Sequence, residues 1–264
     1  MYPKKSLGQH FLKCRWVIST LIKTAEVSQK DTVLEIGPGT GILTRELAKT
    51  AGKVIAIEKD EYLAANLTQR FKKDGVKNIE IIKGDILKKL SEITTNYKLQ
   101  TNSYKVVANI PYYLTARLIR LLLECEPRPE RIVLTVQKEV ARRITAKPPH
   151  ANLLTLSVQV YGTPQIIKDV PADCFYPKPK VDSTIISISD ISDGFFQKNK
   201  ISMENFFEIL RLGFSQKRKM LLGVLGKKLD KQKIAAAFAA TGINPKARPQ
   251  ELSLEQWAKL ISSI

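Results

Sequence analysis

The stretch TVLEIGPGTG, residues 32–41, joins a short apolar run to a loop that is rich in glycine. The apolar run is typical of a buried strand, and the helical pattern Ile42–Lys49 follows the loop at once. Glycines allow the backbone to turn sharply and to approach a ligand closely. The stretch therefore predicts the strand–loop–helix unit of an α/β sheet, with a ligand at the loop.

The glycine spacing and two acidic residues indicate which ligand the loop would hold. Gly37, Gly39 and Gly41 form Gly-x-Gly-x-Gly, not the Gly-x-Gly-x-x-Gly of dinucleotide sites. Glu58 ends the next predicted strand, where an acid can accept both ribose hydroxyls, and Asp85 follows the third strand, where it can accept from an adenine amine. The combination favours S-adenosylmethionine over NAD, because it fits a nucleoside-bearing cofactor without a pyrophosphate.

A fourth predicted strand, Tyr104–Ala108, runs into Asn109-Ile110-Pro111-Tyr112-Tyr113. Pro111 ends this strand because proline cannot donate to a ladder. Right-handed βαβ connections bring the carboxyl ends of all four strands to one edge of the sheet. A methyl donor and an amine acceptor would meet at that edge.

The cluster around Asn109 suits methylation of a planar amine, whose lone pair is delocalised into the ring. The Asn109 side-chain oxygen and a backbone carbonyl in the Pro111 turn can accept the amine hydrogens and localise that pair. Tyr112 can stack on the base, which is worth roughly 1–3 kcal/mol. Catalysis would then rest on positioning and electrostatics. The alternative is an ordinary Asn-Pro turn that caps a strand.

Three basic segments point to a polyanionic partner. Residues 1–15 contain four basic residues and no acid, and form either an arm that closes over a ligand or a frayed terminus. In the segment 175–180, Phe175 can stack on a base while Lys178 and Lys180 meet phosphate; the alternative is a rigid surface loop with a buried aromatic. Lys217 and Arg218 belong to a basic cluster that is either an RNA contact or a solvated helix face.

The formal charge of the 264-residue chain is +18, with a pI near 9.8. Residues 193–264 hold 13 Lys and Arg against 6 Asp and Glu, so both halves of the chain are basic. This charge indicates a nucleic-acid partner, with a lysine-rich proteome as the alternative. Without an apolar run of about 20 residues or a signal-peptide pattern, we expect a cytoplasmic protein with no membrane partner.

The cysteines and histidines predict neither a disulfide framework nor a metal site. Cys14, Cys125 and Cys174 are odd in number and widely spaced. His10 and His150 are the only histidines, and no Cys/His spacing fits zinc. We also expect a monomer.

A domain boundary is predicted at residues 190–194, where the β-branched runs stop. Before it, residues 1–190 form the α/β domain, in which 88–103 is expected to be a surface loop with some helix. Beyond it, residues 195–264 form a helical RNA-binding domain. Its helices are expected at Met203–Ser215, Arg218–Leu225, Lys231–Thr241 and Leu254–Ile261.

Over nearly its whole length the chain resembles the bacterial small-subunit ribosomal RNA adenine dimethyltransferases. The blocks that carry the resemblance are Lys5–Leu12, Glu35–Gly41, Ile57–Asp60, Gly84-Asp85, Asn109–Tyr112, Gln137–Val140, Phe175–Ser183 and Phe214–Lys219. The resemblance implies a Rossmann-like class I methyltransferase sheet with a small all-helical C-terminal domain. It also implies dimethylation of two adjacent adenosines in a hairpin loop near the 3′ end of small-subunit RNA, within the assembling 30S particle.

The resemblance also assigns residues to each substrate. The methyl donor would be held by His10, Leu12, Gly37, Glu58, Asp85 and Asn109. The flipped adenine would be held by Asn109, Tyr112 and Phe175. His10 stands where many members of the family have Asn, so its side chain differs at the expected donor contact. Tyr113 also stands where Asn is frequent, which would alter the edge of the amine pocket. Asn152–Leu154 replaces a usual Tyr-Gly pair.

Three rival functions remain open from the sequence. A large-subunit RNA adenine methyltransferase of the antibiotic-resistance type shares the Asn-x-Pro-Tyr cluster. A non-catalytic RNA-binding assembly factor on the same fold would have lost donor binding, against which intact Gly37, Glu58, Asp85 and Asn109 argue. A nicotinamide dehydrogenase is disfavoured by the glycine spacing and by the charge of +18.

Overall fold

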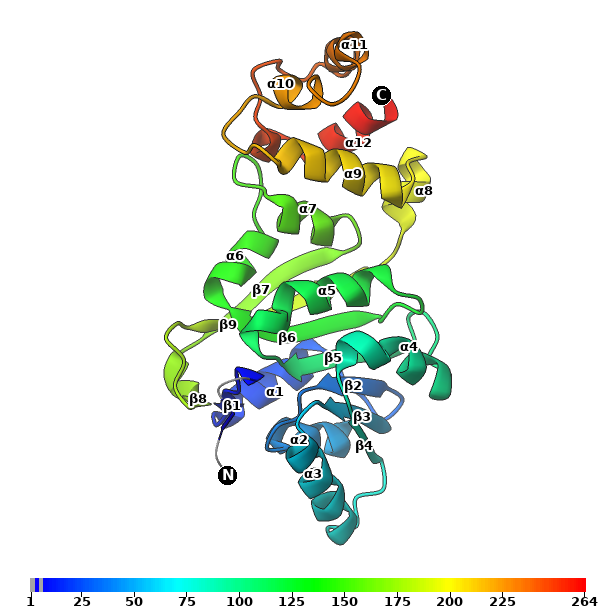
Figure 1. Cartoon of the computed structure of the whole chain (residues 1–264). Helices are drawn as coiled ribbons and strands as arrows, with labels where there is room; N and C mark the ends of the chain where they lie inside the picture. The colour runs from blue at the N-terminus through cyan, green and yellow to red at the C-terminus, as the bar shows by residue number, and fades with distance from the viewer. Residues whose placement is uncertain (1–2, 5–6) are drawn as a thin grey trace. The chain divides into compact units, whose positions relative to one another are not determined.

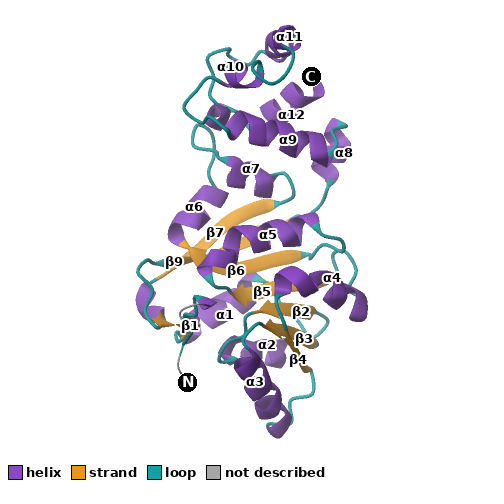
Figure 2. Ribbon diagram, in the orientation of Figure 1, coloured by secondary structure: helices purple, strands orange, loops and turns teal. Residues whose placement is uncertain are grey.

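The computed structural model describes residues 3–4 and 7–264 of the chain (Figures 1 and 2). Lys5 of the basic arm and Ser6 of the first motif block lie outside the described residues. Within this range, no helix has the length and apolar character needed to cross a bilayer. The chain divides into two compact units, one formed by residues 1–141 and 163–191 and the other by residues 142–162 and 192–264.

The first unit is built on a mixed sheet. Among the described residues this sheet has seven strands in the order β4-β3-β2-β5-β6-β9-β7. The first five are parallel, and β9 and β7 join antiparallel at one side. The strands are β2 (Thr32–Ile36), β3 (Lys53–Glu58), β4 (Ile79–Lys83), β5 (Tyr104–Asn109), β6 (Arg131–Gln137), β7 (Thr163–Val170) and β9 (Ser183–Ser189). The predicted α/β class is confirmed.

One helix precedes the first parallel strand, and a helix follows each of the five parallel strands. They are α1 (Arg15–Thr24), α2 (Ile42–Thr50), α3 (Glu61–Lys73), α4 (Ile86–Asn96), α5 (Thr115–Glu124) and α6 (Lys138–Ile144), with short 3₁₀ turns η2 (Tyr112–Leu114) and η3 (Ala172–Cys174). Each crossover brings the next parallel strand back in the same direction, so the carboxyl ends of β2, β3, β4 and β5 meet at one edge. The four predicted strand ends therefore lie together.

The segment 88–103 is more helical than predicted. The helix α4 begins after Asp85, whose side chain accepts a hydrogen bond from the Leu87 amide and caps it. Ile86, Leu90 and Ile93 recur at helical spacing and are buried. The numerous polar residues of this segment occupy the opposite face, which is why composition alone suggested a loop.

The second unit is helical. Its elements are α7 (Leu153–Gln159), α8 (Gly194–Asn199), α9 (Met203–Phe214), α10 (Leu221–Leu225), α11 (Lys231–Thr241), η4 (Pro249–Glu251) and α12 (Leu254–Ser262). The predicted boundary at 190–194 does not assign residues 142–162 to this unit, but Tyr161 packs on Phe196 and Phe207. The ring of Phe214 stacks on the buried Trp257. The α8 helix precedes the first helix that the sequence predicted in this region, Met203–Ser215, and was not predicted.

One expectation about the cysteines is wrong. Cys14 and Cys174 form a disulfide, although 160 residues separate them in sequence. It lies beside one end of a small antiparallel sheet made of β1 (Phe11–Leu12) and β8 (Phe175–Tyr176). Spacing along the chain gave no sign of this pair, because the two segments are brought together only by the tertiary fold. Cys125 is a free thiol.

Candidate active site

The glycine loop between β2 and α2 lies directly against the N-terminal segment. Gly39 adopts a left-handed backbone with φ of +56°, and a Cβ atom there would lie 2.9 Å from the Phe11 ring. Glycine is therefore required at this position for both its conformation and its size. Gly37 also has a left-handed backbone, and its amide donates to the Ile57 carbonyl at 2.9 Å. The loop is consequently anchored to β3.

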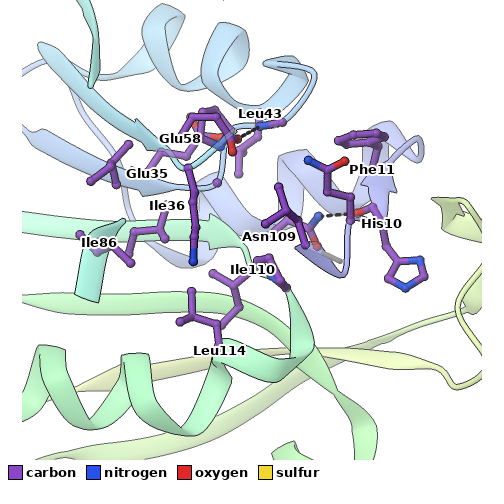
Figure 3. Close-up of a pocket in the computed structure, with 18 of the residues that line it drawn as sticks. His10, Phe11, Glu35, Ile36, Leu43, Glu58, Ile86, Asn109, Ile110 and Leu114 are labelled. Carbon is purple, nitrogen blue, oxygen red and sulfur yellow. Dashed lines mark hydrogen bonds between the residues drawn. The ribbon is translucent and has the colours of Figure 1, made fainter. Parts of the chain in front are cut away.

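Glu58, at the end of β3, holds the glycine loop and the start of α3 together. Its carboxylate accepts hydrogen bonds from the Gly39 amide at 3.0 Å and the Asp60 amide at 2.9 Å. The side chain is buried, and this burial raises the pKa of Glu58. Figure 3 shows the carboxylate at the wall of a cavity, with its bond to the loop dashed.

Asp85 lies at the end of the neighbouring strand, β4. One carboxylate oxygen caps α4 through the Leu87 amide, and the other pairs with the Lys59 ammonium group at 2.9 Å. Burial opposes ionisation of Asp85, but the hydrogen bonds from Lys59 and Leu87 outweigh burial, so the pKa of Asp85 is lowered. Asp85 therefore presents an ionised acceptor beside Glu58.

Asn109 ends β5, and both ends of its side-chain amide are held. The Nδ2 group donates to the His10 backbone carbonyl at 3.1 Å, and Oδ1 accepts from the Thr135 hydroxyl at 2.5 Å. The turn that follows is closed by a hydrogen bond from the Leu114 amide to the Pro111 carbonyl at 3.0 Å. The amide and the turn are thus fixed in position at the predicted sheet edge.

The aromatic residues near this turn differ in their surroundings. Tyr112 bonds the Ser183 hydroxyl at 2.7 Å, and its ring stacks on the His10 imidazole at 5.6 Å between centroids. Tyr113 is 60% exposed, whereas Phe175 is buried in the hydrophobic core and also lines the cavity. The His10 ring bonds the Pro177 carbonyl and points away from Asn109 (Figure 3).

The N-terminal segment is tied to the start of α3. Lys4 pairs with Asp60 at 2.9 Å, and the Gln9 amide also contacts Asp60, at 3.4 Å. The backbone of Lys13 donates to the Cys174 carbonyl at 2.8 Å. These contacts place the described part of the arm over the edge of the sheet. Lys4 is thereby paired with a carboxylate of the chain itself.

A cavity of about 210 Å³ unites these features. The predicted residues that line it are His10, Leu12, Gly37, Gly39, Glu58, Asp85, Asn109, Pro111, Tyr112, Tyr113 and Phe175. Among the described residues, no group of three or more His, Cys, Asp or Glu side chains is arranged to hold a metal ion. The carboxylates of Glu58 and Asp85, at the ends of β3 and β4, line one part of this cavity. The Asn109 amide and the aromatic residues near the end of β5 line the other part.

Comparison with known proteins decides the family. A model for ribosomal RNA adenine dimethylases matches residues 2–264. The chain belongs to the ribosomal RNA adenine dimethylase family. The resemblance that the motif blocks suggested is thereby confirmed.

Relatives of this dimethylase-family chain cover nearly all of it. It is 43% identical to the ribosomal RNA small subunit methyltransferase A of Dehalococcoides mccartyi, over 97% of this chain and 87% of that protein. The protein of the same name from Moorella thermoacetica is 38% identical over 100% of this chain and 93% of its own length. These proteins span both units of the chain.

Two solved structures are similar to both units of this dimethylase-family chain. A dimethyladenosine transferase from Plasmodium falciparum has a TM-score of 0.80 and 27% identity, covering 95% of this chain and 96% of its own. The 23S rRNA methyltransferase ErmE has a TM-score of 0.70 and 27% identity, covering 96% and 98%. The fold is that of Rossmann-like methyltransferases with a helical C-terminal region.

Four predicted residues of this family member are not among those that line the cavity. Lys178 pairs with Asp173 at 2.7 Å, and Lys180 is exposed on the same loop. Lys217 and Arg218 are exposed in the second unit, directly after α9. The structure therefore does not join these four cations to the cavity wall.

Sequence reasoning missed Glu35 as a site residue. This residue lines the cavity, is 1% exposed, and its Oε2 atom has no hydrogen-bond partner among the described residues. Burial and the nearby Glu58 carboxylate raise the pKa of Glu35 to about 8. The sequence did contain a sign of this role. An acidic residue inside a buried strand is unfavourable unless it has a partner, and this one lies directly before the glycine loop.

Proposed function

We propose that this chain dimethylates the N6 amines of two adjacent adenosines in a hairpin loop near the 3′ end of small-subunit ribosomal RNA. The methyl donor is S-adenosylmethionine, and the substrate is the assembling small subunit in the cytoplasm. Membership of the adenine dimethylase family and the names of its relatives support the reaction and the substrate. The observation that carries the proposal is the Asn109 amide opening into the same cavity as Glu58 and Asp85.

The cavity has the chemistry to hold the donor. Glu58 has carboxylate lone pairs left for ribose hydroxyls, and Asp85 can accept from the adenine amine of the donor. The left-handed glycine loop provides a backbone that a ligand can approach closely. The unpartnered Oε2 of the buried Glu35 would gain a partner from a bound ammonium group. When bound, S-adenosylmethionine supplies a methyl group on a sulfonium.

On the acceptor side, the residues of the chain position the target amine. Asn109 Oδ1 accepts one hydrogen bond from Thr135 and keeps a second lone pair for the amine hydrogen. The carbonyls of the Pro111 turn provide the other acceptor. Together they localise the nitrogen lone pair, so that the contribution of the chain is geometry and electrostatics. The ring of Tyr112 fixes the plane of the base.

The basic surfaces account for RNA affinity in this proposal. Lys178 and Lys180 lie on the loop after β8, and Lys217 and Arg218 are exposed in the helical unit. Lysine and arginine contacts to phosphate supply sequence-independent affinity. The region 195–264 would thus serve as the RNA-binding domain.

One observation favours a second candidate. The structure of a 23S rRNA methyltransferase is similar to this chain over both units. The same cavity on a large-subunit RNA would give an enzyme of that type. The curated relatives at 38–43% identity are small-subunit enzymes, which is why the small-subunit RNA is preferred.

Two substitutions test the site. Asn109→Ala should lower methyl transfer by about 100-fold or more while the variant still folds and binds the donor, because it removes a preorganised acceptor. Glu58→Ala should weaken donor binding in calorimetry by about tenfold or more, because two backbone donors and the ribose lose their acceptor. Substantial transfer by the Asn109 variant would contradict the amine site. Unchanged donor affinity in the Glu58 variant would contradict the ribose assignment.

A further inference from the structure

Two buried hydroxyl groups lie behind the acceptor side of the cavity. Thr135 is on β6, directly opposite Asn109 in the parallel β5–β6 register. Ser183 is on β9, opposite Gln137. Both Thr135 and Ser183 are 0% exposed. Each hydroxyl bonds a different residue of the proposed amine site.

Thr135 restrains the catalytic amide. Its hydroxyl lies 2.5 Å from Asn109 Oδ1, while Asn109 Nδ2 donates to the His10 carbonyl. Because that carbonyl can only accept, it fixes which end of the amide carries the nitrogen. Thr135 then holds the oxygen from the β6 side. The second lone pair of Asn109 Oδ1 can then accept a hydrogen bond from one direction only.

Ser183 restrains the aromatic platform in the same way. Its hydroxyl lies 2.7 Å from the Tyr112 hydroxyl, at the far end of the ring from the backbone. The ring is therefore held at its Cβ by the turn and at its hydroxyl by β9. The plane on which a base would stack is set by both attachments.

Packing alone does not account for a hydroxyl at position 135. The other residues from Ile132 to Val136 are apolar and fully buried. A buried hydroxyl is unfavourable unless it forms a hydrogen bond, so valine would serve the sheet equally well. Thr135 is the polar exception in this run and stands opposite Asn109. The Ser183 hydroxyl on β9 is likewise buried, and its hydrogen bond to Tyr112 supplies the partner that burial requires.

We propose that Thr135 and Ser183 are positioning residues for methyl transfer, and that they act through Asn109 and Tyr112. Neither residue is among the described residues that line the cavity. This inference rests on the proposed function, because it assumes that Asn109 and Tyr112 hold the target amine. Through these hydrogen bonds, Thr135 on β6 sets the orientation of the acceptor oxygen, and Ser183 on β9 sets the orientation of the stacking ring.

The experiment measures single-turnover methyl transfer, per donor-binding site, with saturating RNA and donor. Thr135→Val removes the hydroxyl with little change in volume and should lower the rate by about tenfold. Thr135→Ser keeps the hydroxyl and should stay within about threefold of the unmodified chain. The donor dissociation constant should be the same in all three proteins. If the valine variant does not fold, the difference in rate between Thr135→Ala and Thr135→Ser measures the effect of the hydroxyl.

A double-mutant cycle tests the second hydroxyl. Ser183→Ala and Tyr112→Phe each remove one partner of the same hydrogen bond. If this hydrogen bond acts by holding the Tyr112 ring in place, methyl transfer by the double variant should be no slower than by the slower of the two single variants. Thr184→Val is the matched control, since the buried Thr184 hydroxyl bonds Asp169 at 2.8 Å. It should lower stability without changing the rate per binding site.

The outcomes separate the two claims. If the unmodified chain methylates RNA and Asn109→Ala does not, the proposed function stands and the threonine variants decide the positioning role. A wild-type rate in Thr135→Val, or an equal loss in Thr135→Ser and Thr135→Ala, overturns the role of Thr135. Additive effects in the cycle overturn the role of Ser183. An unmodified chain that methylates no RNA overturns the function and the positioning role together.

Discussion

At the residue scale, burial raises the pKa of the Glu35 carboxyl far above its ordinary value. This residue lies in β2, directly before the glycine loop, and one of its oxygens has no hydrogen-bond partner within the described part of the chain. Burial raises its pKa from an ordinary value of 4.5 to about 8. Glu35 is therefore mostly protonated at neutral pH when the cavity holds no cation.

This shift predicts a pH dependence of stability. Between about pH 4.5 and 8 the folded chain keeps a proton on Glu35 that the unfolded chain loses. The free energy of unfolding should therefore fall as pH rises through that window, by up to a few kcal/mol. Glu35→Gln removes the titrating group, so its stability should fall less over the same range.

Urea unfolding at a series of pH values checks this prediction. The difference in unfolding free energy between Glu35→Gln and the unmodified chain should grow in favour of the variant toward alkaline pH. Parallel profiles for the two proteins would show that Glu35 ionises normally in the folded state. Glu46→Gln is a suitable control, because the Glu46 side chain on α2 is 41% exposed and does not line the cavity.

At the scale of elements, β1 and β8 connect the arm to the loop that carries Phe175. Each strand has only two residues, and the disulfide between Cys14 and Cys174 flanks their pairing. Leu12 and Phe175 face the core there and also line the cavity. The wall of the cavity thus depends on a contact between the two ends of the first unit.

Loss of this disulfide should destabilise the first unit. Cys14→Ser, or reduction of the unmodified chain, should lower the free energy of unfolding by about 2–4 kcal/mol, because the closed loop is long. Cys125→Ser is the control, since this thiol is outside the pair and burial raises its pKa to about 11. Thiol titration of the folded chain should find one free thiol before reduction; finding three would contradict the pairing.

The sequence was most informative where local pattern decides structure. Glu58, Asp85 and Asn109 were predicted as neighbours because each follows a buried strand, and parallel strands end at one edge. The β1–β8 pair could not be predicted, because two-residue strands carry no periodicity and the partners are far apart in sequence. The helix α4 was underestimated because polar composition hid the spacing of its buried isoleucine and leucine residues.

At the scale of the whole molecule, the charge of +18 is carried by both parts of the chain. The basic cluster at Lys217 and Arg218 follows α9, and both side chains are exposed to solvent. In the proposed function these cations contact phosphate. Such contacts act on RNA affinity and leave donor binding unchanged.

The double substitution Lys217→Gln, Arg218→Gln should weaken RNA binding and make it less dependent on salt. The slope of log affinity against log salt should fall in magnitude by roughly 0.7–0.9 for each phosphate that the variant no longer neutralises. Lys72→Gln, Lys73→Gln removes the same charge from the end of α3 and is the control. Equal weakening of RNA binding in the two double variants would show a general charge effect instead of a binding site.

Dimethylation of adenosines in small-subunit RNA is the proposed activity on which the roles of the site residues depend. The most direct test incubates the chain with labelled S-adenosylmethionine and small subunits from a strain that lacks the modification, with large-subunit RNA as the parallel substrate. Mass spectrometry of the nucleosides should find dimethyladenosine in small-subunit RNA alone. Label in large-subunit RNA alone, or no transfer with donor still bound, would contradict the proposed activity.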